Sequence, residues 1–136
     1  MTTTAAVFLL GRLLFGMFFV LAGWSHFRST DMLARGAASA GIPLPKVGVL
    51  ASGVLLIAGG LSVILGAWVR LGAIAVMLFL VPAAFTMHRF WSFSDPAQRH
   101  AQLLNFQRNI ALTGAALILY YFAAAHPEVW EYALKP

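Results

Sequence analysis

The stretch GVLLIAGGLSVILGAWVRLGAIAVMLFLVPAAF, residues 53–85, contains one charged residue, Arg70. Its two apolar runs belong to segments of about 47–66 and 68–88, each near the roughly 20 residues that a helix needs to cross about 30 Å of hydrocarbon. The runs are continuous rather than alternating, which favours helices, because a helix satisfies its own backbone hydrogen bonds in lipid. The connection GAWVR (66–70) is so short that the two segments are expected to form an antiparallel hairpin of membrane-spanning helices.

The composition of the whole chain agrees with a membrane protein. Of its 136 residues, 61% are hydrophobic and 10% are charged, whereas soluble domains average roughly 45–50% apolar and about 25% charged residues. Two further apolar segments, about 5–27 and 105–125, complete the set of expected spans. The sequence therefore predicts an all-α polytopic membrane protein, a four-transmembrane-helix bundle that forms a single membrane domain over residues 1–136.

Polar stretches between the spans predict two short helices. After the first span, Asp31 stands in a first helical turn and Gly41 provides a stop, so a helix of about ten residues is expected there. It is too short to cross the membrane and is expected to lie at the interface or to fold against the bundle. In the third linker the sequence Ser-Asp-Pro (94–96) has the order of a helix start, so another short polar helix is expected before the fourth span. The N-terminus lacks the basic start of a signal peptide, and the first span is expected to be retained.

Lysine and arginine residues outside the spans predict the orientation of the chain. The side that carries linkers 28–46 and 89–108 holds Arg28, Arg35, Lys46, Arg89, Arg99 and Arg108, whereas the other side holds Arg70 and Lys135. Because cytoplasmic loops carry an excess of these residues, the protein is expected in the cell (inner) membrane with both linkers on the cytoplasmic side and both termini on the outer side. The basic residues form no single basic face, so nucleic acid is not expected as a partner.

Glycine spacing predicts how two of the spans pack. Gly16 and Gly23 lie seven residues apart in the first span, and Gly53 and Gly60 lie seven apart in the second. Each pair falls on one helix face, and small residues let helix backbones approach closely in lipid. We expect these two faces to meet. Pro82 predicts a kink in the third span.

The predicted topology brings polar residues of three spans to one side of the membrane. One interpretation is a small ligand site suited to a quinone head group or another small polar ligand. The other is an ordinary interfacial belt, in which tryptophans mark the interface and asparagines join helices. The spacing of the histidines does not require haem ligation, and no metal site is predicted. The residues of the candidate ligand site are His26, His88, Trp91, Asn105, Arg108 and Asn109.

Arg12 is a separate signal, because it lies roughly 10 Å inside the first span at 1.5 Å per residue. A charge at this depth is costly unless it is paired or reaches the interface. The partners open to it are helix carbonyls, the hydroxyls of Tyr120 or Tyr121, and the carboxylates of Glu128 or Glu131.

Five blocks of sequence, in order along nearly the whole chain, resemble the DoxX family. They are GRLLFGMFFVLAGWSHF (11–27), AGIPLP (40–45), GGLSVILGAWVRLGA (59–73), HRFW (88–91) and NFQRNIALTGAALIL (105–119). Single blocks are mostly apolar. The combination of an arginine in the first span, the Gly-Ile-Pro turn, Arg70 after the hairpin, the His-x-x-Trp and the Asn-Phe-x-x-Asn gives the resemblance its specificity.

This resemblance implies a four-helix membrane protein of a family named after a small subunit of an archaeal thiosulfate:quinone oxidoreductase. Some members are linked to membrane-associated oxidoreductase complexes in oxidative stress and thiol homeostasis, and distant relatives act as membrane-protein chaperones. Many members carry a glutamate in the second span before the Gly-Gly pair, where this chain has the apolar residues 55–57. The residues that match the family's polar positions are Arg12, His88, Trp91, Asn105 and Asn109.

Two functions remain open. The first is a non-catalytic membrane subunit of a redox system, quinone-linked or in thiol homeostasis, with quinone as a non-covalent cofactor. Its expected partners are the lipid bilayer and a soluble or membrane-bound oxidoreductase, and a homo-oligomer stays open. The second is a membrane scaffold or assembly chaperone without a redox role. A self-contained enzyme ranks third, because the chain has no cysteine, no carboxylate within a span and no nucleotide motif.

Overall fold

The fold consists of four long helices and three short helical elements. The structure, a computed structural model, describes residues 2–130. Four of its helices are long and apolar enough to cross a membrane: α1 (Thr3–Arg28), α3 (Pro45–Leu65), α4 (Val69–Thr86) and α5 (Pro96–Ala125). The short elements are α2 (Thr30–Ser39) and the 3₁₀ helices η1 (Phe90–Ser92) and η2 (Pro127–Trp130). The prediction of an all-α membrane protein with a short helix between its first two spans is confirmed.

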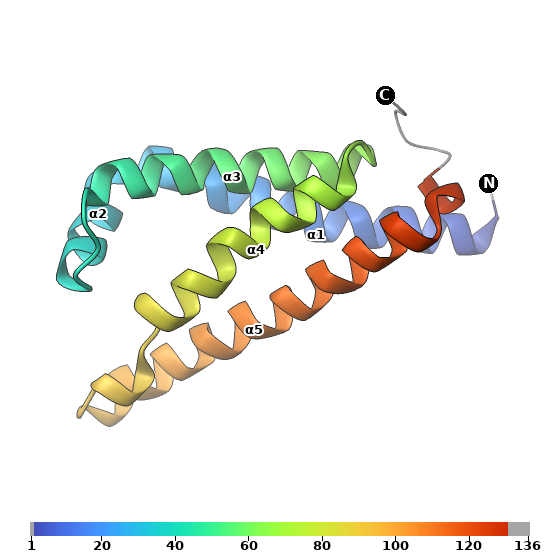
Figure 1. The fold of residues 1–136 in the computed structure, drawn as a ribbon. Helices are drawn as coiled ribbons and strands as arrows, with labels where there is room; N and C mark the ends of the chain where they lie inside the picture. Colours follow the sequence, from blue (N-terminus) through green and yellow to red (C-terminus); the bar gives the residue numbers. More distant parts are fainter. Residues whose placement is uncertain (1, 131–136) are drawn as a thin grey trace.

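The long helices form two antiparallel pairs. α1 lies beside α3 and α4 lies beside α5, and the turn between α3 and α4 joins the pairs (Figure 1). The pairs are close together at this turn and diverge toward the end that carries α2 (Figure 1). η2 and the start of α1 lie near the turn, where Trp130 and Phe8 pack against the buried side chain of Val63. The molecule is therefore closed at one end and splayed at the other.

The predicted contact between the glycine faces of α1 and α3 is confirmed. A Cβ atom at Gly16 would lie 2.6 Å from the carbonyl oxygen of Gly60, and one at Gly23 would lie 2.7 Å from that of Gly53. No side chain fits at these distances, so the two backbones touch directly. This close approach supplies packing contacts that the hydrophobic effect cannot provide inside a bilayer.

The turn between α3 and α4 is equally tight. Gly66 ends α3 in the left-handed conformation, with φ 69°, which glycine adopts without steric strain. The hydroxyl of Ser62 donates to the carbonyl of Ala67 at 2.5 Å. A Cβ atom at Gly59 would lie 2.9 Å from the carbonyl oxygen of Gly72, so the first turns of the predicted hairpin are in backbone contact.

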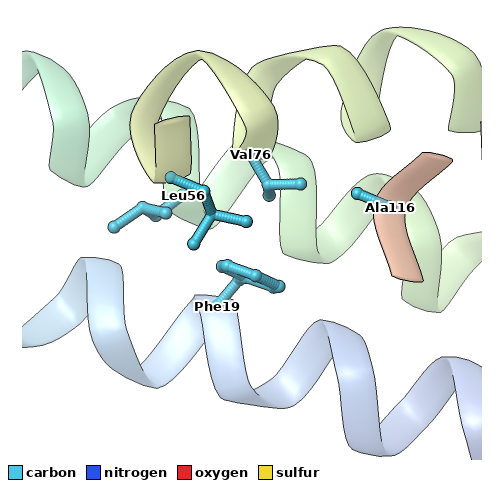
Figure 2. Close-up of a cluster of buried hydrophobic side chains, with 5 residues drawn as sticks. Phe19, Leu56, Val76 and Ala116 are labelled. Atoms are coloured by element: carbon cyan, nitrogen blue, oxygen red, sulfur yellow. The ribbon is translucent and has the colours of Figure 1, made fainter. Parts of the chain in front are cut away.

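A small hydrophobic core joins all four long helices near mid-height. Phe19 of α1, Leu56 of α3, Val76 of α4 and Ala116 of α5 are each fully buried and point toward one another (Figure 2). Leu80 completes the cluster. The outer surfaces of the helices are also apolar, with leucines such as Leu14 and Leu78 largely exposed. Such surfaces match a lipid environment, and the chain is a multi-pass membrane protein.

The third linker differs from its prediction. A separate short helix was expected before a fourth span starting near residue 105, but one continuous helix, α5, runs from Pro96 to Ala125. Asp95 caps it by accepting from the backbone N–H of Gln98 at 2.9 Å, and Pro96 occupies its first turn. The residues that follow are good helix formers without an intervening glycine or proline, so nothing interrupts the helix at the expected boundary. Pro82, the residue at which a kink was predicted, lies inside α4.

Candidate functional site

A cavity of about 510 Å³ lies between the two helix pairs, at the splayed end of the molecule. Its inner wall is apolar and contains the core residues Phe19, Leu56 and Leu80. Its polar lining residues belong to the half of the molecule nearer α2, and none of them is acidic. They are His26, Ser52, Thr86, His88, Arg108 and Asn109.

His26, near the end of α1, is held by α3. Its Nδ1 lies 2.8 Å from the hydroxyl oxygen of Ser52 and 3.2 Å from the carbonyl oxygen of Val49. The Ser52 hydroxyl itself donates to Val49 at 2.9 Å. Because the carbonyl can only accept, this arrangement assigns the imidazole proton to Nδ1 and leaves Nε2 as a free acceptor. Phe79 of α4 meets the imidazole edge to face, at 5.3 Å between ring centroids.

His88 follows α4 and is tied to α5. Its Nδ1 lies 2.9 Å from Oε1 of Gln102, and the side chain is half-buried. An amide oxygen accepts, so Nδ1 again carries the proton, and Nε2 has no hydrogen-bond partner among residues 2–130. The two histidines of the cavity therefore have the same tautomer, each with Nε2 available to a ligand in the described part of the chain.

Asn109 and Arg108 bring α5 into the cavity. Asn109 is 4% exposed, and its Nδ2 donates one long hydrogen bond, 3.4 Å, to the carbonyl oxygen of Leu80. Thr113, the next member of the predicted polar stripe, donates to the carbonyl of Asn109 in its own helix. Arg108 is exposed, and no carboxylate among residues 2–130 lies within ion-pair distance of its guanidinium. The α5 side of the cavity thus offers one amide and one unpaired cation.

Two of the predicted site residues do not line the cavity. Trp91 in η1 is half-exposed and stacks edge to face on Phe90 and Phe106, with ring centroids 5.1 and 6.0 Å apart. Asn105 is half-buried on α5 but is absent from the cavity wall. The structure therefore brings together His26, His88, Arg108 and Asn109, and leaves Trp91 and Asn105 outside.

The short helix α2 forms part of the cavity wall, which the sequence did not predict. Leu33 and Ala37 of α2 line the cavity. Two polar contacts hold this region: Arg89 Nη2 donates to the carbonyl of Ala40 at 3.5 Å, and Lys46 Nζ lies 2.7 Å from Asp31 Oδ1. Hydrogen bonding to the Lys46 ammonium, with its charge, holds the pKa of Asp31 below its usual range.

Ser52 and Thr86 were also missed. Ser52 lies in a span that was interpreted only as a packing helix, and its role emerges from its contact with His26. Thr86 donates to the carbonyl of Pro82 at 2.8 Å, so its hydroxyl is already engaged. The available signal in the sequence was a hydroxyl within an apolar run. It does not show whether that hydroxyl contacts a histidine of another helix, as in Ser52, or a carbonyl of its own helix, as in Thr86.

Arg12 lies away from the cavity and is 3% exposed. Its Nε donates to the carbonyl of Val63 at 3.0 Å and its Nη2 to that of Ile64 at 2.8 Å. The last carbonyls of a helix have no partner within the helix, so Arg12 satisfies the end of α3. Its guanidinium carbon also lies 4.9 Å from the ring centroid of Trp130, in the range of a cation–π interaction.

Among the partners that the sequence left open for Arg12, the helix carbonyls are therefore the ones observed. Glu131 and Lys135, which entered the predictions for Arg12 and for orientation, lie outside the described residues. Leu56, within the segment where many family members are expected to carry a glutamate, packs in the core with Phe19. In this chain that segment does not face Arg12.

Fold and site define a class of small multi-pass membrane proteins with four spanning helices and a polar-rimmed cavity between helix pairs. The DoxX family model matches residues 7–89, more than half of the chain, and the protein belongs to the DoxX family. The block at 105–119 lies beyond the matched residues. The chain is similar to the inner membrane protein YphA of Escherichia coli (strain K12), with 23% identity over 111 residues that cover 82% of this chain and 79% of YphA. No solved structure matches it significantly.

Proposed function

We propose that this protein is a non-catalytic membrane subunit of a redox system and that it binds a quinone in the cavity between its helix pairs. The observation that carries the proposal is the chemistry of the cavity wall. An apolar interior meets a polar rim that contains histidine, amide and guanidinium groups and no carboxylate. A ligand with an apolar body and hydrogen-bond-accepting oxygens suits such a wall.

The polar groups can serve both forms of a quinone. The amide of Asn109 and the guanidinium of Arg108 donate hydrogen bonds, which the carbonyl oxygens of an oxidised quinone accept. The free Nε2 of His88 accepts a hydrogen bond, which the hydroxyl of a reduced quinol donates. The electrons would come from an oxidoreductase partner.

Binding of a short-chain quinone such as decylubiquinone to the purified protein tests this proposal. In the double variant His88→Ala, Asn109→Ala we expect the dissociation constant to rise by roughly tenfold or more, because two hydrogen bonds of about 1 kcal/mol each are removed. A second variant, Ala51→Trp, places a large ring at an exposed position of the cavity wall. It should reduce binding without removing a polar group.

Asn105→Ala is the matched control, because Asn105 is an amide on the same helix outside the cavity wall. Its affinity for the quinone should equal that of the unaltered protein. An unchanged affinity in both cavity variants would refute the site. Co-purification of an oxidoreductase with the tagged protein from native membranes would support the subunit role, and its consistent absence would count against that role.

We further propose that the protein lies in the inner membrane with residues 28–46 and 89–108 in the cytoplasm and both termini outside. Two observations support this. The relative YphA is an inner membrane protein, and the basic residues of these linkers, such as Arg35 and Arg99, are exposed at the splayed end of the molecule. In this orientation the polar rim of the quinone cavity faces the cytoplasm.

A further inference from the structure

A second cavity, also of about 510 Å³, lies at the closed end of the molecule. It is formed by the turn between α3 and α4, the start of α4, the end of α5 and η2, and none of the lining residues among 2–130 is acidic. It shares no residue with the quinone cavity. Its lining residues include Trp68, Arg70, Leu71, Ile74, Tyr120 and Trp130.

Arg70 is the cation of this cavity, and no carboxylate among residues 2–130 balances its charge. It stands in the first turn of α4, whose N-terminus has no side-chain cap. The N-terminus of a helix carries a partial positive charge and unpaired N–H groups, so a cation there repels the helix and favours an anion between them. Among residues 2–130 no carboxylate lies within ion-pair distance of Arg70.

The ring of Tyr120 holds the guanidinium of Arg70 at the cavity, whereas Glu128 does not pair with it. The Cζ atom of Arg70 lies 5.7 Å from the centroid of the Tyr120 ring, which is a wall of the same cavity. Glu128, the acidic residue of η2, is engaged elsewhere, with Oε1 3.1 Å from Nδ1 of His126. A hydrogen bond from its own backbone N–H and the contact with His126 hold the pKa of Glu128 below its usual range.

Trp130 contributes an aromatic wall to this cavity and is 5% exposed. Its indole nitrogen is itself buried and is not a contact for a ligand. The wall of this cavity therefore combines a cation with an uncapped helix N-terminus, and both favour a ligand that carries negative charge.

The location of the cavity indicates the source of that ligand. The cavity lies at the ends of membrane-spanning helices, and its apolar part includes Leu71 and Ile74, which are 65% and 38% exposed on the outer surface of α4. A free anion would leave this apolar part empty, whereas the acyl chain of a lipid would cover it. We infer that this cavity binds the phosphate group of an anionic phospholipid, with Arg70 as the principal contact.

The experiment compares three additives to the purified full chain in an uncharged detergent: phosphatidylglycerol, phosphatidylcholine and inorganic phosphate. The readouts are the thermal unfolding midpoint and the number of lipids retained in native mass spectrometry. Phosphatidylglycerol should raise the midpoint more than phosphatidylcholine. In Arg70→Gln, affinity for phosphatidylglycerol should fall roughly tenfold, as expected for one charge-assisted hydrogen bond, and one fewer lipid should be retained.

Arg70→Lys keeps the charge and should keep most of the phosphatidylglycerol effect, which separates a lipid contact from a structural role of the side chain. Arg28→Gln removes an exposed arginine at the opposite end and should retain the full effect at this cavity. The inference is overturned if Arg70→Gln retains the preference for phosphatidylglycerol, or if inorganic phosphate alone reproduces the rise in the midpoint. These outcomes are independent of quinone binding, which concerns the other cavity.

Discussion

At the scale of single residues, Arg12 shows how helix carbonyls can stabilise a charge inside a span, with no acidic partner among residues 2–130. Its guanidinium bonds two carbonyls at the end of α3 and lies against the ring of Trp130. Those carbonyls would otherwise lack partners in a medium without water, where each unsatisfied group costs several kcal/mol. Arg12 and the end of α3 therefore satisfy one another.

We predict that Arg12→Met lowers the free energy of unfolding by about 3 kcal/mol, because two charge-assisted hydrogen bonds are lost and two carbonyls become unsatisfied. The free energy of unfolding of Arg12→Lys should lie between those of the unaltered protein and Arg12→Met, since an ammonium keeps the charge but lacks the planar fork that reaches both carbonyls. The measurement is denaturant or thermal unfolding of the purified protein in detergent micelles. Arg28→Met, at an exposed position, is the control, and equal stability of Arg12→Met and this control would contradict the assignment.

At the scale of helices, the contact between α1 and α3 depends on glycine. Gly16 and Gly60 meet at one level and Gly23 and Gly53 meet two turns away. The same contact bears on the scaffold hypothesis, in which a helix face would hold other membrane segments. Because α1 already covers Gly53 and Gly60, the glycine face of α3 is not available for that role.

Gly60→Ala should separate α1 from α3, because the new Cβ would lie 2.5 Å from the carbonyl oxygen of Gly16. We expect a loss of roughly 1–3 kcal/mol in the free energy of unfolding, as for other overpacked interiors. Gly11→Ala provides a matched control, since no atom lies within 4 Å of a Cβ at Gly11. That change should be neutral or stabilise the helix by up to about 1 kcal/mol. Similar effects of the two substitutions on unfolding would show that the contact is not limiting.

The sequence predicted these helices and this contact because both depend on local patterns. Apolar length defines a span, and glycines seven residues apart define a face. The role of α2 could not be predicted in the same way: its caps indicated a short helix, but the contact of Leu33 and Ala37 with the cavity depends on how the helix pairs diverge. The start of α5 at Asp95 and Pro96 was predicted from the order of its capping residues, but its continuity was not, because the fourth span was placed by its apolar residues and its polar first turns were expected as a short helix of their own.

At the scale of the whole molecule, the two helix pairs create a site that no single helix contains. Topology alone placed the ends of the first and third spans and the start of the fourth on one side, and His26, His88, Arg108 and Asn109 do line one cavity. Spacing did not show how far the cavity extends, and Trp91 and Asn105 of the predicted set lie outside its wall. Arg70 entered the predictions as a count in the orientation argument and as a residue of the family resemblance. Its contacts with Tyr120 and the turn could not be predicted, because they are tertiary.

The proposed orientation gives a direct prediction, because the chain contains no native cysteine that would react. Single cysteines at Ser39 and Ser94, both exposed at the splayed end, should react with a membrane-impermeant maleimide only after the cells are permeabilised. A cysteine at Trp68, 65% exposed in the turn between α3 and α4, should react in intact cells. The reverse pattern of labelling would invert the proposed topology and place the proposed quinone cavity on the outer side.

The pairing of Arg12 with the end of α3 also constrains how the chain enters the membrane during synthesis. The carbonyls that Arg12 bonds belong to residues 51 and 52 positions later in the chain. A ribosome therefore exposes α1 to the insertion machinery before the partner of its charge has been made. An arginine at the centre of an isolated span disfavours insertion by about 3 kcal/mol. The stable form of the first helix is reached only when the second hydrophobic helix arrives, which makes their insertion a joint event.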